Sequence, residues 1–307
     1  MGVMSDDHLP VPRNVTICFR HTVPGAAALS ARLAEQTRGA GAGVWLGALP
    51  DPAHGAEAAA FADQLAVSDL LICVGGDGTV LHAAEFASAG GPPIFGVRMG
   101  RLGFLTETTE AEAVPALEIV LTGGARIEPR TMARVVNADG EEMHALNDVV
   151  IGRRSIGRSV SVGARLDGVL VAEYRGDAVV VSTATGSTGY SLSAGGPILH
   201  PTSDELVLVP VAPHLTRANA LVLPAGVQIR LFVARGESAM LTVDGRHERP
   251  VETGALVEVS RSARTVRFVR LGGTNQFYAN LAQRLGWLRV DHVIGDADPA
   301  TVDRSPQ

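Results

Sequence analysis

The sequence predicts an α/β fold, with an N-terminal doubly wound, Rossmann-like α/β domain followed by a β-rich, layered domain similar to a β-sandwich. Up to about residue 125, apolar strand-like segments alternate with helix-like segments, the pattern of a parallel sheet covered by helices. From about residue 126 the apolar segments become short and Val-rich, and Gly or Asp-Gly turns separate them. A third observation is the fully apolar run at residues 70–74, typical of a strand buried on both faces, which stops at Gly75.

Composition and charge limit the function classes. The 307 residues are enough for two domains, and 46% apolar with 19% charged residues is typical of a globular protein. The formal net charge of −6 argues against a protein that coats nucleic acid or an anionic membrane. No apolar run approaches the roughly 20 residues that a membrane helix needs.

The ends and the cysteines predict a cytoplasmic protein. Asp6, Asp7 and Pro10 lie where a signal peptide needs an apolar core, so a flexible leader is expected at residues 1–12. Cys18 and Cys73 lie in apolar strand-like runs, which favours buried thiols over a disulfide or a zinc site.

The N-terminal domain is expected at residues 13–125. Its predicted strands are residues 14–20, 44–46, 69–74 and 93–97, and its predicted helices are residues 26–38, 56–66, a segment from residue 79, and 110–121. Ligands of such sheets gather at the carboxyl ends of the strands, where the turn at Gly75 lies.

The β-rich domain is expected at residues 126–271. Its predicted strands are residues 132–137, 142–151, 160–166, 169–174, 178–182, 206–211, 228–233, 240–243 and 266–271. Only residues 185–195 and 275–285 look helical in this half, and residues 295–307 are expected to be a flexible tail.

The turn after the buried strand carries the first candidate site. Gly75, Gly76 and Gly78 surround Asp77, and we expect them to adopt positive φ and let a ligand approach the backbone. Thr79 is the expected N-cap of the next helix, and such a turn suits phosphate. It is not a Walker loop, because no Lys follows the glycines. The alternative is a tight strand-to-helix turn in which Asp77 satisfies local N–H groups.

Two further polar features stand in apolar surroundings. Phe104 lies on a Gly-flanked loop, where its ring could pack against a base or belong to the core. Asn147 and Asp148 interrupt an apolar run, and polar groups inside a strand are costly unless paired. Their acceptors and amide donor suit ribose hydroxyls or an adenine edge, whereas a locally paired β-bulge is the alternative.

Residues 183–197 (TATGSTGYSLSAGGP) concentrate hydroxyl groups and glycines after a predicted strand. This composition favours hydrogen bonds to a polar ligand, and Tyr190 could cover a ring. A capped helix between two strands is the alternative.

Taken together, these segments resemble the NAD kinase family. The matching signatures, in family order, are residues 75–79 (GGDGT), 100–105 (GRLGFL), 147–150 (NDVV), 176–177, 185–197, 244–245 and 285–287. The GGDGT sequence is shared with diacylglycerol-type and phosphofructo-type kinases, whereas the hydroxyl-rich segment with the Asn-Asp pair is much more specific. The family fold implies that residues 272–290 pack back on the N-terminal domain.

The resemblance implies Mg²⁺-dependent transfer of phosphate from ATP, or from polyphosphate in some members, to the 2′-hydroxyl of the adenosine ribose of NAD. Asp77 is then the general base, and Gly75, Gly76, Gly78 and Thr79 form the phosphate-donor loop. No protein side chain is assigned as a metal ligand. The implied assembly is a homodimer or homotetramer, with NAD and ATP as ligands and neither nucleic acid nor membrane as partner.

The resemblance also assigns the dinucleotide contacts. Asn147 and Asp148 would hold the ribose and adenine, with Asp77 and Gly78 at the reacting hydroxyl. The remaining assigned residues are Thr188, Gly189, Tyr190, Ser191, Leu192 and Ser193 on the adenine side, Phe104 beside them, Asp177 at the nicotinamide end across a subunit boundary, and Arg158, Arg175 and Arg246.

Some positions depart from the family pattern. The family usually has Asn where Arg98 stands, Glu where Asp148 stands, and Gln where Arg246 stands. The two arginines either tighten the binding of a more anionic ligand or are surface substitutions. Two other functions therefore stay open: a kinase of the same fold acting on another nucleoside or a polyol, and a dinucleotide sensor without catalysis. A lipid kinase is disfavoured, because no basic amphipathic surface helix is present.

Overall fold

The structure is a computed structural model that describes residues 8–51, 55–88, 90–100, 103–155, 157–214, 219–234 and 238–286. The chain divides into two compact units between Leu271 and Gly272. The second unit contains one described helix, α6 (Gln276–Arg284).

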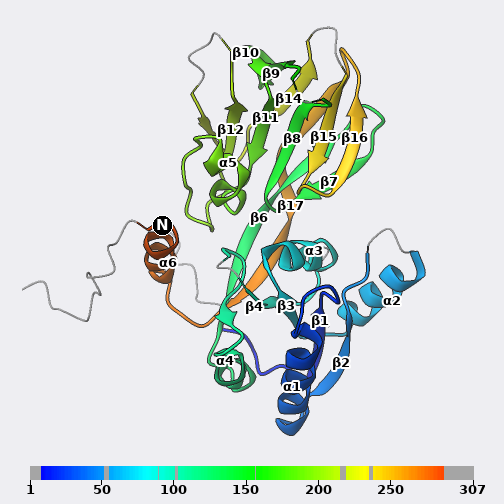
Figure 1. Cartoon of the computed structure of the whole chain (residues 1–307), viewed down its shortest axis with the longest axis vertical. Coiled ribbons are helices and arrows are strands. Elements are labelled where there is room, and N and C mark those ends of the chain that lie inside the picture. The colour runs from blue at the N-terminus through cyan, green and yellow to red at the C-terminus, as the bar shows by residue number, and fades with distance from the viewer. Residues whose placement is uncertain are drawn as a thin grey trace, which may run out of the picture. The chain divides into compact units, whose positions relative to one another are not determined.

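A parallel sheet forms the N-terminal part of the first unit (Figure 1). Its strands, in spatial order, are β2 (Gly43–Ala48), β1 (Asn14–Phe19), β3 (Leu70–Gly75) and β4 (Ile94–Arg98). Every residue of β3 is buried, as its unbroken apolar sequence predicts for a central parallel strand. The doubly wound α/β prediction is confirmed here.

Helices cover both faces of this sheet. Helices α1 (Ala26–Gly39) and α4 (Ala113–Leu121) share one core with Ile17 and Ile72, while α2 (Gly55–Ala66) and α3 (Asp77–Ala87) share the other with Leu71 and Cys73. The alternation of side chains along each strand thus feeds two separate cores. No helix in the described ranges is long and apolar enough to span a membrane.

The parallel sheet continues into the second half of the chain. The long strand β17 (Leu256–Arg270) pairs in parallel with β4 at Phe268 and antiparallel with β6 (Arg126–Val136). Within the described residues this sheet has 11 strands. Its remaining members are β5 (Thr108–Thr109), β7 (Glu142–Ala145), β9 (Val160–Leu166), β10 (Val169–Gly176) and β14 (Ile229–Val233).

A second sheet lies over the β-rich half of the first. Its six described strands, in spatial order, are β13 (Leu221–Leu223), β12 (Leu206–Val211), β11 (Ala178–Ser182), β8 (Asp148–Arg153), β15 (Ala239–Val243) and β16 (His247–Val251). Val149 and Ile151 of one sheet share a core with Val162 and Leu231 of the other. The β-rich half is therefore a two-layered sandwich, as predicted.

Two predicted strands differ in detail, and others were not predicted. The strand expected at residues 142–151 is divided into β7 and β8, because Leu146 and Asn147 leave the ladder between them. The strand expected at residues 266–271 is the end of β17, which begins ten residues earlier at Leu256. Strands β13 and β16 were not expected. The sequence of β16 contains Pro250 and charged residues, which are unfavourable in strands and prevented its prediction.

The leader expected at residues 1–12 is only partly described. Residues 1–7, like the expected tail at residues 295–307, lie outside the described residues. Leu9 is 3% exposed and its N–H donates to the Ala125 carbonyl at 2.9 Å, so this part of the segment belongs to the compact unit. Its burial is explained by contact with the core that α1 and α4 share.

Candidate active site

The turn between β3 and α3 is tight at its first glycine and open at the others. A Cβ on Gly75 would overlap the side chain of Thr79, whereas a Cβ on Gly76 or Gly78 would meet nothing within 4 Å. The expected positive φ is wrong, since none of these three glycines lies in the left-handed region. Gly75 is required by a close contact, and the backbone beside Gly76 and Gly78 is accessible to a ligand.

Helix α3 begins earlier than expected. Asp77 is its first residue and Gly76 its N-cap, with extended φ and ψ of −94° and −177°. The expectation that Thr79 caps the helix is therefore wrong. Its side chain is 3% exposed and packs against Gly75, so it closes the turn from within.

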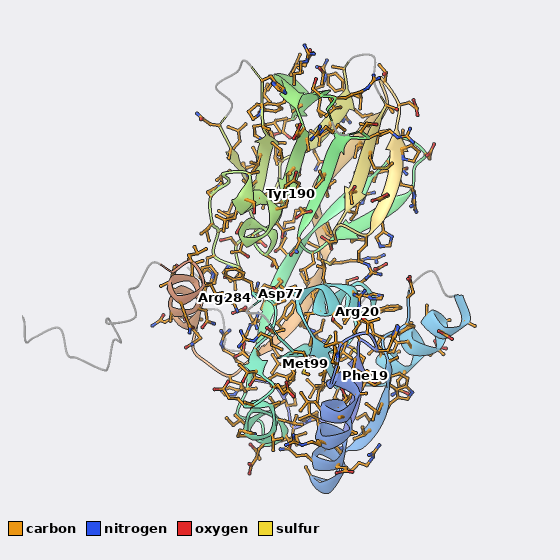
Figure 2. All side chains as sticks on the ribbon, viewed as in Figure 1. Phe19, Arg20, Asp77, Met99, Tyr190 and Arg284 are labelled. Atoms are coloured by element: carbon orange, nitrogen blue, oxygen red, sulfur yellow. The ribbon has the colours of Figure 1, made fainter. Side chains whose placement is uncertain are left out.

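The carboxylate of Asp77 is fixed by the loop that follows β4. Oδ2 accepts the N–H of Phe104 at 2.5 Å, and Oδ1 accepts the N–H of Leu105 at 3.1 Å. Gly103 is needed beside it, because a Cβ there would overlap the carboxylate. Asp77 is half-buried at the start of α3 (Figure 2), and two amides define its orientation.

The Asn147–Asp148 turn is held by the half-buried carboxylate of Asp244. Asp244 accepts the N–H groups of Leu146 at 2.7 Å, Asn147 at 2.8 Å and Asp148 at 3.0 Å. Asp244 has a φ of +51°, which directs its side chain back to this turn from the end of β15. Sequence reasoning found Asp244 as part of a signature but not its role, since three bonds over nearly a hundred residues leave no local signal.

The hydroxyl-rich segment packs directly on this turn. The Asn147 carbonyl accepts the N–H of Thr183 at 2.9 Å, and the Thr183 hydroxyl donates to the Leu146 carbonyl at 2.5 Å. A Cβ on Gly186 would overlap the backbone of Asn147. Two segments that the sequence separates by about 35 residues thus form one surface.

Burial shifts the titration of both acids in this region. Asp148 is 8% exposed, and burial raises its pKa to about 6. Its carboxylate accepts no hydrogen bond from the described part of the chain. Burial also raises the pKa of Asp244, to about 7, although its three N–H donors act in the opposite direction. The backbone of the Asn-Asp pair is thus satisfied by a distant carboxylate rather than by a locally paired β-bulge, and the Asp148 side chain has acceptor capacity left for a ligand.

Tyr190 and Asp177 lie within electrostatic reach of Asp148. Burial raises the pKa of Tyr190, and the charges of Asp177 and Asp148 raise it further. The Tyr190 ring is 43% exposed (Figure 2), and Asp177 forms an ion pair with Arg153 at 3.1 Å. Sequence reasoning did not select Arg153, because its pair with Asp177 is a contact over 24 residues.

The rest of the hydroxyl-rich segment forms two short helical turns. They are a 3₁₀ turn at Gly186–Thr188 and α5 at Tyr190–Ser193, with Gly189 between them. The Thr188 hydroxyl donates to the Thr185 carbonyl at 3.2 Å. Ser191 is fully buried with its hydroxyl against Gly196, whereas Leu192 is half-buried and Ser193 exposed.

The three predicted arginines lie in two different surroundings. Arg158 is exposed, and its carbonyl accepts a bond from Arg153 at 3.3 Å. Arg175 is exposed on β10 and donates to Ser159 at 3.1 Å. Arg246 instead flanks α3, 4.0 Å from Glu85, beside a cavity of about 680 Å³ that Arg20 and His82 also line.

Two family models match the chain over most of this unit. The ATP-NAD kinase N-terminal domain matches residues 47–125, and the ATP-NAD kinase C-terminal domain matches residues 146–271. The fold and the matched segments define the class as phosphotransferases that act on a dinucleotide.

Individual relatives agree with this class. NAD kinase of Heliobacterium modesticaldum is 43% identical over 216 residues, which is 68% of this chain and 76% of the relative. NAD kinase of Dehalococcoides mccartyi strain BAV1 is 32% identical over 89% of this chain and 96% of its own. The chain belongs to the NAD kinase family.

Solved structures show the same fold. Yeast NADH kinase complexed with NADH aligns with a TM-score of 0.78 at 22% identity, over 92% of this chain and 90% of that one. An NAD kinase from Archaeoglobus fulgidus in complex with ATP aligns with a TM-score of 0.72 at 24% identity, over 90% and 100%. At these identities the likeness concerns the fold alone.

Proposed function

We propose that this protein is an NAD kinase that transfers the γ-phosphoryl group of ATP to the 2′-hydroxyl of the adenosine ribose of NAD, giving NADP and ADP. The observation that carries the proposal is Asp77, a carboxylate fixed by two amides at the carboxyl end of a parallel sheet, next to an accessible glycine turn. Membership of the NAD kinase family supports the same reaction.

Asp77 acts as the general base in this proposal. It takes the proton of the 2′-hydroxyl while the hydroxyl oxygen forms a bond to the γ-phosphorus, and the bond from that phosphorus to the bridging oxygen of ADP breaks. Phosphoryl transfer depends mainly on positioning and charge neutralisation, so a carboxylate of defined orientation is the part that the protein must supply. The N–H groups of Phe104 and Leu105 supply that orientation.

The donor phosphates approach the open side of the turn. Gly76 and Gly78 leave this space free, while Gly75 and Thr79 close the turn behind them. A Mg²⁺ ion bound to the donor would neutralise phosphate charge. Mg²⁺ sites of kinases take one or two carboxylates and otherwise phosphate and water oxygens.

The acceptor binds to the surface that Asn147, Asp148 and the hydroxyl-rich segment share. The unpaired carboxylate of Asp148 accepts ribose hydroxyl or adenine donors, and the exposed Tyr190 ring covers the base. Thr188, Gly189, Leu192 and Ser193 line the adenine side with Phe104 nearby. Asp177 and the arginines at 158 and 175 contact the nicotinamide end, partly across a subunit boundary. We leave the buried Ser191 hydroxyl out of these contacts and assign no acceptor contact to Arg246.

The test is turnover with defined donors and acceptors. Purified protein with Mg²⁺, ATP and NAD is expected to produce NADP, and labelled ATP offered with other nucleosides and polyols is expected to label NAD preferentially. Polyphosphate in place of ATP tests the donor. Lack of preference for NAD would favour a kinase acting on another acceptor, and binding without turnover would favour a sensor.

The role of Asp77 is tested by Asp77→Asn. We expect turnover to fall at least about a hundredfold while NAD affinity stays within about twofold. Asp139→Asn, an exposed carboxylate in a turn after β6, is the matched control and should leave turnover unchanged. Equal turnover in the Asp77 variant would remove it from the base role.

We also propose that the enzyme is cytoplasmic and works as a homodimer or homotetramer. The domain division at residues 13–125 and 126–271, with residues 272–290 returning to the first domain, stays a prediction. Light scattering on the purified protein measures the assembly, and cross-linking between α6 and the N-terminal helices tests the return.

A further inference from the structure

A cluster of buried charges lies between the two parts of the candidate site. The buried charge cluster consists of Glu107 after β4, Glu128 and Arg130 on β6, and Arg270 at the end of β17. Glu128, Arg130 and Arg270 are only 6%, 5% and 8% exposed. The proposed chemistry makes no use of these groups.

The four side chains form one continuous chain of ion pairs. Arg270 Nη1 donates to Glu107 Oε2 at 2.8 Å, and Arg270 Nε donates to Glu128 Oε1 at 3.2 Å. Arg130 Nη2 donates to the same Glu128 oxygen at 2.6 Å. The two guanidinium groups also lie near one ring, 5.4 and 5.2 Å from the centroid of Phe268. These contacts leave each member few alternative positions.

The charges remain ionised despite their burial. Burial alone would raise the pKa of Glu128, but Arg130 and Arg270 lower it to about 2. Burial lowers the pKa of Arg130 to about 10, still far above neutral pH. Arg270 is buried too, but Glu107 and Glu128 together raise its pKa. A buried ionised cluster seldom adds net stability over apolar residues, so a role in defining geometry is the better explanation.

One end of the cluster reaches the loop that holds Asp77. Glu107 Oε1 accepts the N–H of Leu271 at 2.8 Å, so its carboxylate ties the loop after β4 to the end of β17. Glu107 follows Phe104 and Leu105, whose N–H groups hold the Asp77 carboxylate. The anchor therefore lies two residues beyond the second amide that orients Asp77.

The other end reaches the hydroxyl-rich segment. Arg130 Nη1 donates to the Thr185 hydroxyl at 3.3 Å, and Thr185 is 5% exposed. Thr185 lies two residues after Thr183, which bonds the Asn147–Asp148 turn. The cluster thus connects the segment beside the proposed acceptor surface with the loop beside the proposed base.

We propose that Glu107 and Arg130 are positioning residues, and that the buried charge cluster holds the Asp77 loop and the hydroxyl-rich segment in one fixed register through Arg270 and Thr185. This inference rests on the proposed function for its kinetic test. According to this proposal, residues of β6, β17 and the loop after β4 influence turnover, although none of them contacts substrate.

Two variants break the cluster at opposite ends. Glu107→Gln keeps the shape and an acceptor for the Leu271 N–H but removes the charge that pairs with Arg270. Thr185→Val keeps the shape and removes the acceptor of Arg130. We expect kcat of Glu107→Gln to fall about tenfold or more with little change in the Kd for NAD, because the loop that orients Asp77 loses its anchor. The Kd for NAD of Thr185→Val should rise about fivefold.

The double variant measures the coupling between the ends. If the cluster holds both segments in one register, the combined loss in kcat/KM should differ from the product of the single losses by about threefold or more. Hydrogen exchange gives a readout without substrate: in Thr185→Val, the distant amides of Phe104 and Leu105 should exchange about threefold faster. Glu141→Gln, which breaks the exposed pair with Arg249 at 2.6 Å, is the matched control and should change neither readout.

The outcomes separate the two proposals. A wild-type enzyme without NAD kinase activity contradicts the proposed function, and the exchange experiment still tests the cluster. The positioning role is overturned if the wild type is active, the losses in kcat/KM of the two single variants simply multiply in the double variant, and amide exchange is unchanged in Thr185→Val. If Glu107→Gln does not fold, the neutral and isosteric Thr185→Val decides through its exchange pattern.

Discussion

Three carboxylates of this site differ in what surrounds each of them. Asp77 and Asp244 are both half-buried, and they accept two and three backbone amides respectively. Asp148 is buried without a described partner. A paired acid defines geometry, whereas an unpaired one has acceptor capacity left for a ligand. The residue type alone does not distinguish these roles.

The unpaired acid leads to a prediction about pH. The pKa of Asp148 is raised to about 6, so its carboxylate becomes protonated below that pH and loses its capacity as a charged acceptor. We expect NAD affinity to weaken as the pH falls from 7 to 5, by up to about tenfold per unit below the pKa. Titration calorimetry measures the Kd at each pH.

Asp148→Asn provides the control for this profile. It keeps the shape and removes the titrating group, so its affinity should be lower at pH 7 and nearly constant between pH 5 and 7. A variant with the same slope as the wild type would assign the pH dependence to another group.

At the scale of elements, two glycines are required by close contacts, and for Gly75 this replaces the positive φ that was expected. Gly75 and Gly186 have ordinary backbone conformations, and each is needed because another segment lies against its Cα hydrogen. Gly186 faces the backbone of Asn147, which cannot move without disturbing the bonds from Asp244.

Gly186→Ala is therefore expected to displace the Asn147–Asp148 turn. We predict that the KM for NAD rises about tenfold and that the melting temperature falls, because overpacking against backbone costs roughly 1–3 kcal/mol. Steady-state kinetics and thermal unfolding monitored by circular dichroism measure the two effects.

Gly39→Ala is the matched control for this substitution. Gly39 ends α1, has no positive φ, and has nothing within 4 Å of an added Cβ. Its replacement should leave KM unchanged and stability the same or slightly higher. If KM and the melting temperature are the same in both variants, the contact between Gly186 and Asn147 does not contribute to NAD binding or stability.

Sequence patterns predicted where helices and strands lie better than which distant residues contact one another. The apolar run of β3 and the short Val-rich segment of β9 before an Asp-Gly turn are local signals, and both strands lie close to where they were expected. The start of β17 was missed because its exposed face carries charges such as Arg261 and Arg264. The Asp244 clamp and the Arg153–Asp177 pair are long-range contacts, which one sequence cannot reveal.

At the scale of the whole first unit, the buried charge cluster has a consequence for acid stability. Burial acts to raise the pKa of Glu128, but Arg130, Arg270 and Arg126 together lower it to about 2 from the ordinary 4.5. A carboxyl group with a depressed folded pKa contributes stability above its unfolded pKa, and loses it as the pH falls through the folded value. The contribution of Glu128 should therefore disappear between about pH 4.5 and pH 2.

The predicted size of this effect is at most about 3 kcal/mol, at about 1.4 kcal/mol per unit of pKa shift. Denaturant unfolding at pH 7, 5, 4 and 3 measures it. Glu128→Gln should be less stable than the wild type at pH 7, and the difference should shrink steadily below pH 4.5. A difference that is constant with pH would show that Glu128 is not held ionised by its arginines.

The strand β17 also has a consequence for how the protein is made. It pairs with β4 and β6, so a residue near position 268 completes a sheet whose first strands come from the beginning of the chain. During synthesis, the edge of β4 that pairs with Phe268 therefore stays unpaired until almost the whole first unit has left the ribosome. Early nascent chains should accordingly be protease-sensitive and should depend on chaperones, with resistance gained abruptly once β17 has emerged.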